Sequence, residues 1–416
     1  MLSTLILSVV LGTATGPIPV KVVLTNSGFQ LRREGKPYFI RGGGCSDTTG
    51  PWLDGLKAAG GNSVRTWGAD GAEALLDAAQ ARGMTVMIGI WLGHTEHGMK
   101  WNDPKMVADQ IADVKKWVLK YKNHPAVLAW ALGNEMEGGA DQPKLWSAVN
   151  EMAVWIKRVD PDHPVLTVVA EMNQEKADAI KKYAPALDFL GINSYGGLAT
   201  LPKRLKEYGV TTPYAITEFG TPGPWESAKT PWGVPIEKTS TAKAADYRSN
   251  YLTSISGNPA QCLGSYAFIW GTKQEETATW FGTHLPSGEN LGAVEELTEL
   301  WTGHYPKNRV PVITKLAMVS LDTVAPEGVM RAEIQASDPD SDDLTYEWGM
   351  ETAVVEKNAE GVVESSFRIL TTTTLPDGRH QVTLKAPHTP GFYRLMVKVL
   401  DGHNNAACGN IAFQVK

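Results

Sequence analysis

The chain has 416 residues, of which 43% are hydrophobic and 20% are charged. This length and apolar content are typical of a globular protein of two or three domains with a large buried core. A formal net charge of -6 without a basic cluster excludes the electrostatic footprint of a nucleic-acid-binding protein. The fourteen Trp residues are more informative, because indole rings pack both in cores and against the apolar faces of sugars.

The first sixteen residues, MLSTLILSVVLGTATG, form an apolar run followed by small residues, a pattern that resembles a secretory signal peptide. They are too short to cross a bilayer as a mature helix, and no other stretch reaches the roughly eighteen apolar residues that a membrane helix needs. The three cysteines are odd in number and far apart, which argues against a disulfide framework. We therefore expect a secreted or periplasmic protein without a transmembrane segment.

Short apolar runs alternate with segments of helical spacing in the first two thirds of the chain, after a short strand near Lys21–Leu24. The expected helices include Gly71–Gly83, which ends on glycine, Asp103–Tyr121, which opens with an Asp-Pro pair, and Pro143–Val159. The eight expected strands are Pro37–Cys45, Asn62–Gly68, Thr85–Gly93, Ala126–Leu132, Val165–Glu171, Phe189–Gly196, Tyr214–Gly220 and Gly264–Trp270.

Eight strands separated by helices predict a (β/α)8 TIM barrel over residues 20–304, with an active site at the carboxyl ends of the strands. A doubly wound open sheet is the main alternative. Its dinucleotide-binding form needs a Gly-rich phosphate turn after the first strand, and Gly42–Ser46 lacks the required spacing. The chain also lacks the Gly-x-Ser-x-Gly elbow of esterases and the phosphate loop of ATPases.

Residues 305–416 have a different pattern, in which a linker precedes alternating strands separated by Pro, Gly and Asp turns. Several short strands at this spacing predict an immunoglobulin-like β-sandwich. Four aspartates in one turn could bind calcium there, although turn chemistry explains clustered aspartates equally well. These aspartates are Asp338, Asp340, Asp342 and Asp343.

Two expected strands end on acidic residues. The run Ala126–Leu132 is followed by Asn134 and Glu135, and the strand Tyr214–Gly220 carries Glu218. Either glutamate alone would be an ordinary surface carboxylate. At the rim of one barrel, two such glutamates predict glycoside hydrolysis, in which one carboxyl is the acid/base and the other is a nucleophile or base.

A wider set of strand-end residues resembles the retaining glycoside hydrolases of clan A. Within the clan, the phrases GGNSVRTWG, TEFGTPGPWE, KTPWGVPIE and AFIWGTKQEETATWFG look most like the endo-β-1,3-glucanase family 158. The barrel is also similar to that of the family 2 β-glycosidases. The match covers residues 37–300, and the residues that carry it are Arg65, Asn134, Glu135, Tyr195, Glu218 and Trp270.

The resemblance implies that Glu218 is the nucleophile and that Glu135 is the acid/base. A charge-assisted hydrogen bond from Arg65 would orient Glu218 and keep it ionised, and Tyr195 would donate a second one. Asn134 would bond the sugar 2-hydroxyl, a contact that strengthens in the transition state. The structural alternatives are an ordinary ion pair for Arg65 and a loop cap for Asn134.

Aromatic residues in the strand-end loops are further candidates for sugar binding. Trp270 would form the apolar floor under the sugar that is cleaved. Ordinary loop packing explains each of the other rings equally well, but additional sugar units could stack on them. These rings are Trp67, Trp91, His94, Trp225, Trp232 and Trp280.

Three further glutamates, Glu137, Glu171 and Glu226, are acidic rivals of the proposed pair. No strand-end phrase of the clan fits them, so we expect substrate contacts from them at most. The group His94, Glu96 and His97 lacks both the zinc-binding helix pattern and an evident third ligand. We therefore expect no metal and no other cofactor.

The sequence thus predicts a retaining hydrolase of β-glucan that cleaves a laminarin-type polymer internally and acts as a monomer. The expected partner is a polysaccharide or oligosaccharide, and not a nucleic acid. One alternative is another β-glycosidase of the clan, such as a β-galactosidase, a mannanase or a transglycosidase. The other is a non-catalytic glycan-binding protein, against which the intact pair Glu135 and Glu218 argues.

Overall fold

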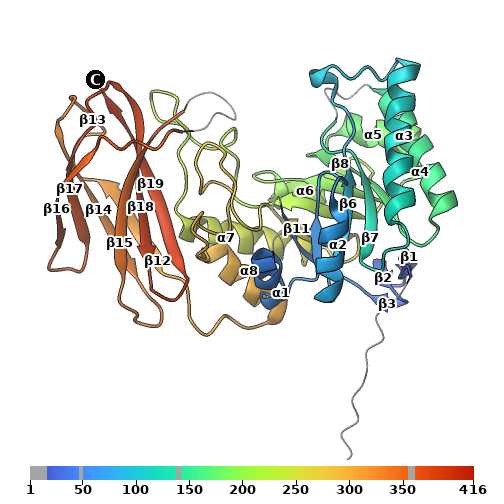
Figure 1. Cartoon of the computed structure of the whole chain (residues 1–416), viewed down its shortest axis with the longest axis horizontal. Coiled ribbons are helices and arrows are strands. Elements are labelled where there is room, and N and C mark those ends of the chain that lie inside the picture. Colours follow the sequence, from blue (N-terminus) through green and yellow to red (C-terminus); the bar gives the residue numbers. More distant parts are fainter. Residues whose placement is uncertain (1–15, 46–49, 137–141, 355–360) are drawn as a thin grey trace, which may run out of the picture.

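The computed structural model describes residues 16–45, 50–136, 142–354 and 361–416, which form two domains side by side (Figure 1). An α/β barrel comes first, and a β-sandwich, in orange to red, follows it. Residues 1–15, which hold nearly all of the expected signal peptide, and Glu137 lie outside the described residues. Among the described helices, none combines the length and the apolar character needed to cross a membrane.

Eight parallel strands close into a barrel in the order β10-β11-β4-β5-β6-β7-β8-β9, so the predicted TIM barrel is confirmed. The strands are almost entirely buried, because side chains fill the barrel interior and helices cover its outside. The strands are β4 (Ile40–Gly44), β5 (Ser63–Arg65), β6 (Thr85–Ile90), β7 (Val127–Leu132), β8 (Val165–Ala170), β9 (Phe189–Asn193), β10 (Tyr214–Phe219) and β11 (Cys262–Ala267).

Helices connect successive strands on the outside of the barrel (Figure 1). The Asp-Pro signal marks a real helix start, because the Asp103 side chain accepts hydrogen bonds from the N–H groups of Lys105 and Met106, at 2.9 and 3.2 Å. The helices are α1 (Gly50–Ala58), α2 (Ala72–Ala81), α3 (Pro104–Tyr121), α4 (Pro143–Val159), α5 (Gln174–Tyr183), α6 (Leu201–Glu207), α7 (Ser240–Asn250) and α8 (Gly292–Thr302), with short turns η1 (Thr95–His97), η2 (Leu198–Thr200) and η3 (Tyr251–Ile255).

A small antiparallel sheet closes the amino-terminal end of the barrel. Its residues Val20 and Leu31 share a hydrophobic cluster with Leu128 of β7 and Leu166 of β8. The predicted first strand was therefore too long at its start, because Pro37 pairs within this sheet rather than in the barrel. The strands of the sheet are β1 (Val20–Thr25), β2 (Gly28–Arg33) and β3 (Lys36–Pro37).

The eighth barrel strand differs from its prediction, which was Gly264–Trp270. β11 ends at Ala267, three residues before Trp270. Beyond the strand, the N–H of Trp270 donates to the carbonyl of Gly44 at 3.0 Å, in a loop that folds over the barrel. Trp270 therefore does not occupy the strand end that the sequence pattern assigned to it.

The C-terminal domain is the predicted sandwich of two four-stranded sheets, β12-β14-β17-β16 and β13-β19-β18-β15. Alternating apolar residues of both sheets, among them Met330, Leu384, Leu395 and Phe413, meet in its core. The strands are β12 (Val312–Met318), β13 (Thr323–Val324), β14 (Val329–Ser337), β15 (Thr345–Thr352), β16 (Arg368–Thr374), β17 (His380–Lys385), β18 (Gly391–Leu400) and β19 (Ala406–Val415).

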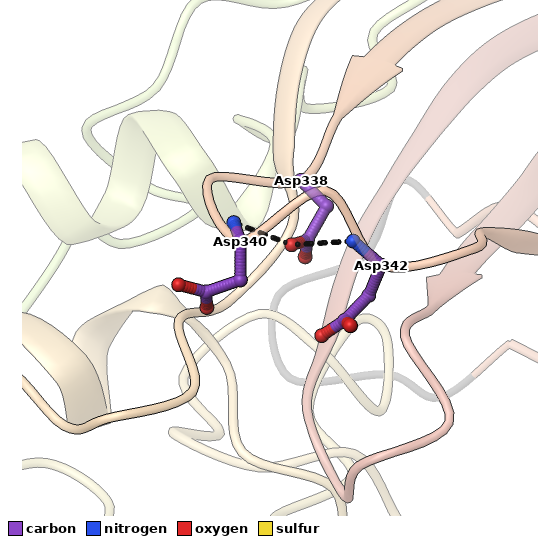
Figure 2. A group of neighbouring side chains, drawn as sticks. All are labelled: Asp338, Asp340 and Asp342. Carbon is purple, nitrogen blue, oxygen red and sulfur yellow. Dashed lines mark hydrogen bonds between the residues drawn. The ribbon is translucent and has the colours of Figure 1, made fainter.

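Three of the four candidate calcium ligands gather in the turn between β14 and β15 (Figure 2). The Asp338 carboxylate accepts hydrogen bonds from the N–H groups of Asp340 and Asp342, at 2.8 and 3.2 Å. The carboxylates of Asp340 and Asp342 accept from the linker, through the Arg309 N–H and the Asn308 side chain, both at 2.6 Å. Turn geometry and linker binding thus account for these aspartates, and calcium binding stays a prediction.

Candidate active site

A cavity of about 580 Å³ opens at the carboxyl ends of the barrel strands, where a TIM barrel carries its active site. Its walls come from the ends of β7 to β11 and from the loops that follow them and β5. The lining residues are Trp67, Asn134, Glu135, Ala170, Glu171, Asn193, Tyr195, Glu218, Trp225, Glu226, Phe268, Ile269, Lys273 and Glu275.

Glu218 projects into this cavity from β10 and is held by three hydrogen-bond donors. Oε1 accepts from the guanidinium of Arg65 at 2.7 Å and from the indole N–H of Trp67 at 2.8 Å. Oε2 accepts from the hydroxyl of Tyr195 at 2.7 Å. Because only 6% of Glu218 is exposed, these donors take the place of water around its negative charge.

Glu135 follows β7 in a backbone conformation that few residues other than glycine adopt, with φ at 50°. Gly133, two residues earlier, also has a positive φ of 70°, and the Glu135 N–H donates to the carbonyl of Val168 at 3.0 Å. This turn directs the side chain to the cavity, where its Oε1 accepts from the side-chain amide of Asn193 at 2.6 Å.

A shared hydrogen-bond network joins the two glutamates. The Asn134 Oδ1 atom accepts from Arg65 at 2.6 Å and from Asn193 at 3.1 Å. Arg65 in turn binds Glu218, and Asn193 binds Glu135. Since Arg65 is only 1% exposed, its charge is balanced within this network and not by solvent.

The Tyr195 hydroxyl acts as a donor in the network. Burial, and then the neighbouring Glu218 carboxylate, raise the pKa of Tyr195 well above its usual range, so the hydroxyl keeps its proton. The edge-on rings of Phe268 and Trp225 lie 5.9 and 6.0 Å from the Tyr195 ring and hold it in place.

Two of the expected aromatic residues, Trp67 and Trp225, line the cavity. The Trp67 indole hydrogen-bonds Glu218 and packs edge-on against Phe268 at 5.8 Å, so it contributes a donor as well as an apolar surface. Trp225 is 48% exposed, which leaves a ring face open to a sugar.

The other expected aromatic residues lie outside the lining of the cavity. Trp91 is 49% exposed and stacks on His94, with ring centroids 4.8 Å apart, and His94 stacks in turn on His97 at 5.4 Å. Trp232 stacks on Phe392 of the sandwich at 6.4 Å. These rings are therefore separate from the two glutamates.

Trp270 and Trp280 are buried, at 2% and 1% exposed. The indole N–H of Trp270 donates to the carbonyl of Trp52 at 3.0 Å, and its ring stacks on Trp301 at 6.1 Å. Trp270 thus packs behind the barrel wall and forms no floor of the cavity. Phe268, two residues earlier, is the aromatic residue of this loop that lines it.

The rival glutamates Glu171 and Glu226 both line the cavity but are fixed by the protein itself. Glu171 pairs with Arg204 at 2.6 Å. Glu226 accepts from the N–H groups of Gly196 and Gly223, at 3.0 and 3.1 Å. Their carboxylates are therefore rigid parts of the wall.

Sequence reasoning missed several cavity residues. Asn193, which links the two halves of the network, stood within the strand Phe189–Gly196 and could have been found from its position two residues before Tyr195. Lys273 and Glu275 lie in the long loop after β11, where no periodic pattern indicates which side chains face inward.

The sequence of residues 55–223 matches the family described as Glycosyl hydrolases family 2, TIM barrel domain. This match agrees with the similarity of the barrel sequence to the family 2 β-glycosidases. The similarity to the endo-β-1,3-glucanase family 158 stays a prediction.

Solved structures with a similar fold include a β-glucuronidase from Ruminococcus gnavus, with a TM-score of 0.55 and 17% identity over 68% of this chain and 52% of that chain. The β-D-glucuronidase of Dictyoglomus thermophilum gives a TM-score of 0.55 and 17% identity, over 68% of this chain and 54% of that chain. Bacteroides uniformis β-glucuronidase 2 matches 95% of this chain and 48% of its own, with a TM-score of 0.52 and 13% identity.

The chain thus spans about half the length of these enzymes, and at such identities the likeness is one of fold. The family match is independent of that likeness, because it rests on the sequence of the barrel. Residues 55–223 are therefore similar in sequence to the TIM-barrel domain of the glycosyl hydrolases of family 2.

Proposed function

We propose that this chain is a retaining β-glycoside hydrolase with Glu218 as nucleophile and Glu135 as acid/base. The observation that carries the proposal is the unequal surroundings of the two carboxylates. Glu218 accepts three hydrogen bonds, one of them from the buried guanidinium of Arg65, and Glu135 accepts a hydrogen bond from the neutral side-chain amide of Asn193. The first setting suits an anionic nucleophile, and the second suits a group that gives up and takes back a proton.

The reaction has two half-reactions. Glu218 attacks the anomeric carbon while Glu135 donates its proton to the leaving glycosidic oxygen, which gives a glycosyl ester on Glu218 and the free leaving group. In the second half-reaction, Glu135 takes a proton from water, and the water oxygen displaces the Glu218 carboxylate. Both groups return to their starting states.

The network around the glutamates supports this sequence of steps. Tyr195 and Trp67 donate to different oxygens of Glu218, so the carboxylate cannot rotate away from the sugar. The described hydrogen bonds of Asn134 all use its Oδ1 atom, which directs its side-chain nitrogen to the cavity as a donor for the sugar 2-hydroxyl.

The charges of the lining support a neutral sugar as the substrate. Among the described residues, five carboxylates line the cavity, on Glu135, Glu171, Glu218, Glu226 and Glu275. The one cation among these described lining residues is Lys273, which already pairs with Glu275. A carboxylate on the sugar would be repelled by these lining carboxylates. The charges therefore favour a neutral β-glucan over the glucuronides of the structural neighbours.

Within the neutral β-glucans, we propose internal cleavage of a β-1,3-glucan. This finer assignment rests on the loop phrases that resemble family 158 and on the exposed face of Trp225 at the cavity. Another neutral β-glycosidase activity would use the same glutamates. The retained catalytic network is the feature that argues against a non-catalytic glycan-binding protein.

The deciding experiment is a substrate panel with product sizing, run on the wild type and on Glu218→Gln. We expect oligosaccharides from laminarin, and no release from mannan, p-nitrophenyl β-galactoside or p-nitrophenyl β-glucuronide. An NMR time course should show the β-anomer first. Efficient glucuronide cleavage would refute the neutral-sugar assignment, and the α-anomer as first product would refute the two-step mechanism.

Export also remains a proposal, based on the first sixteen residues. Expression of the full chain in a bacterium, followed by fractionation and N-terminal sequencing, tests it. Recovery of uncleaved protein from the cytoplasm alone would count against export.

A further inference from the structure

Two long loops form one wall of the cavity. The loop between β10 and α7, residues 220–239, contributes Trp225 and Glu226, and the loop between β11 and α8, residues 268–291, contributes Lys273 and Glu275. We call these segments the two wall loops. Neither contains a helix or a named strand, so other contacts must fix their positions.

Glu237 ties the two wall loops together. It belongs to the first loop and is 7% exposed. Its carboxylate accepts hydrogen bonds from the hydroxyls of Thr277 and Thr279 in the second loop, at 2.8 and 2.9 Å. Lys243 completes the junction, because its ammonium binds Glu237 at 2.5 Å and the Thr279 carbonyl at 2.6 Å.

The sandwich reaches into the same junction. The side-chain amide of Asn410, on β19, donates to Glu237 at 2.6 Å and accepts from Arg394 of β18 at 3.0 Å. Arg394 is 0% exposed and donates to the carbonyl of Pro235 in the first wall loop at 2.8 Å. Two residues of the C-terminal domain thus bind the loops that shape the cavity.

Arg394 also lies over Trp280 in the second wall loop, with its guanidinium carbon 5.7 Å from the ring centroid. Trp280 belongs to the hydrophobic cluster that contains Tyr195, Phe268 and Phe281. Through this cluster, the contact connects the sandwich to Tyr195, whose hydroxyl donates to Glu218.

The domain interface around this junction is continuous. The N–H of Cys408 on β19 donates to the hydroxyl of Ser240 at 2.8 Å. The N–H of Ile313 on β12 donates to the hydroxyl of Thr241 at 2.9 Å. Both hydroxyls belong to α7, which follows the first wall loop, and Figure 1 shows α7 beside β19.

We propose that Asn410 and Arg394 are positioning residues for the active site, which act through Glu237 by fixing the two wall loops. On this reading the sandwich is part of the catalytic unit and not an appended module. The proposal deepens the proposed function, since it assigns the second domain a role in shaping the same cavity. Directional hydrogen bonds to a buried carboxylate suit this role, because they fix a loop within fractions of an ångström where apolar packing alone is more tolerant.

The test measures the loops directly, by hydrogen exchange and mass spectrometry of the full chain. Asn410→Leu keeps the branched shape of the side chain but removes its hydrogen bonds to Glu237 and Arg394. We expect exchange in residues 222–238 and 271–285 to become about tenfold faster, as for the loss of roughly one hydrogen bond. Arg379→Met is the matched control, because Arg379 pairs with Glu333 and Asp377 within the sandwich. Arg379 directly precedes β17, which Figure 1 shows on the side of the sandwich remote from the barrel.

A milder pair of variants keeps the test decisive if Asn410→Leu fails to fold. Thr277→Val removes the hydroxyl that binds Glu237, whereas Thr277→Ser retains it. We expect faster exchange in the second wall loop for the valine variant and wild-type exchange for the serine variant. Equal exchange in both, or no change with Asn410→Leu, would overturn the proposal.

Kinetics on the substrate found by the panel supply a second measurement. Displaced wall loops should raise KM more than they lower kcat. The effect of Asn410→Leu should shrink in a Lys273→Ala background, because both changes act on the same wall. Exchange needs no substrate, so an inactive wild type would refute the proposed function and leave the loop measurement valid. Unchanged exchange in an active enzyme would refute only the positioning role.

Discussion

Replacing Glu351 by Gln should change how the stability of this protein depends on pH. Glu351 lies on β15, is 6% exposed, and has a carboxylate oxygen without a hydrogen-bond partner among the described residues. Burial, followed by the negative charge of Glu237, raises its pKa from 4.5 to about 7, against the opposing effect of Arg394. The folded protein therefore holds this proton more tightly than the unfolded chain does.

The sign and size of the effect follow from that difference. Between pH 4.5 and pH 7 the unfolded chain loses the proton first, so the free energy of unfolding falls as pH rises. The full loss is about 3 kcal/mol, at about 1.4 kcal/mol for each pH unit. Gln mimics the protonated carboxyl and has no such dependence. Glu351→Gln should therefore match the wild type at pH 4 and exceed its stability by up to about 3 kcal/mol at pH 8.

Urea unfolding at pH 4, 6 and 8, followed by tryptophan fluorescence, measures this difference. Glu347→Gln is the matched control, because Glu347 is an exposed glutamate on the same strand. If the two variants show the same pH dependence relative to the wild type, Glu351 is not the buried proton acceptor that the structure describes.

Three further predictions concern the barrel. Glu218→Gln and Glu135→Gln should each lower turnover by several orders of magnitude with an unchanged circular dichroism spectrum, and near-normal activity in either would contradict its assigned role. Tyr195→Phe should lower kcat about ten- to a hundredfold, because it removes one hydrogen bond to a charged group. Since the pKa of Tyr195 is raised, the wild type should lose no turnover up to pH 9 through ionisation of this hydroxyl. Asp160→Asn should cost about 3 kcal/mol of unfolding free energy at pH 7 without altering KM, because Asp160 is 3% exposed and hydrogen-bonded to His163. Burial opposes ionisation of Asp160, but the hydrogen bond and the charge of His163 outweigh burial and lower the pKa of Asp160. The stability that this pair contributes should therefore be lost as pH falls. Thermal unfolding at pH 3 and pH 7 measures that loss.

The repeating strands and helices made the barrel predictable, because strands that are buried on both faces appear in the sequence as continuous apolar runs. The two strand-end glutamates were predictable for a related reason, since the carboxyl ends of parallel strands all meet at one rim. Arg65 and Tyr195 came from the resemblance, and the structure places both against Glu218.

Loops were harder to predict. Trp270 was placed by counting along an apolar run that continues past the end of β11, and nothing in that run marks where the backbone leaves the barrel. Lys273 and the Glu237 junction depend on contacts between loops distant in sequence and on the second domain, which no local pattern encodes.

The linker between the domains has a consequence for protein engineering. Its residues Asn308 and Arg309 are held by Asp342 and Asp340 of the sandwich, while the Arg309 guanidinium also pairs with Glu295 of α8 at 2.5 Å. A chimera that joined this barrel to a foreign sandwich at the linker would cut through these bonds. The smallest unit that can be transferred between proteins is therefore larger than either domain. A chimera should keep these bonds only when the linker, the aspartate turn and the last barrel helix are exchanged together.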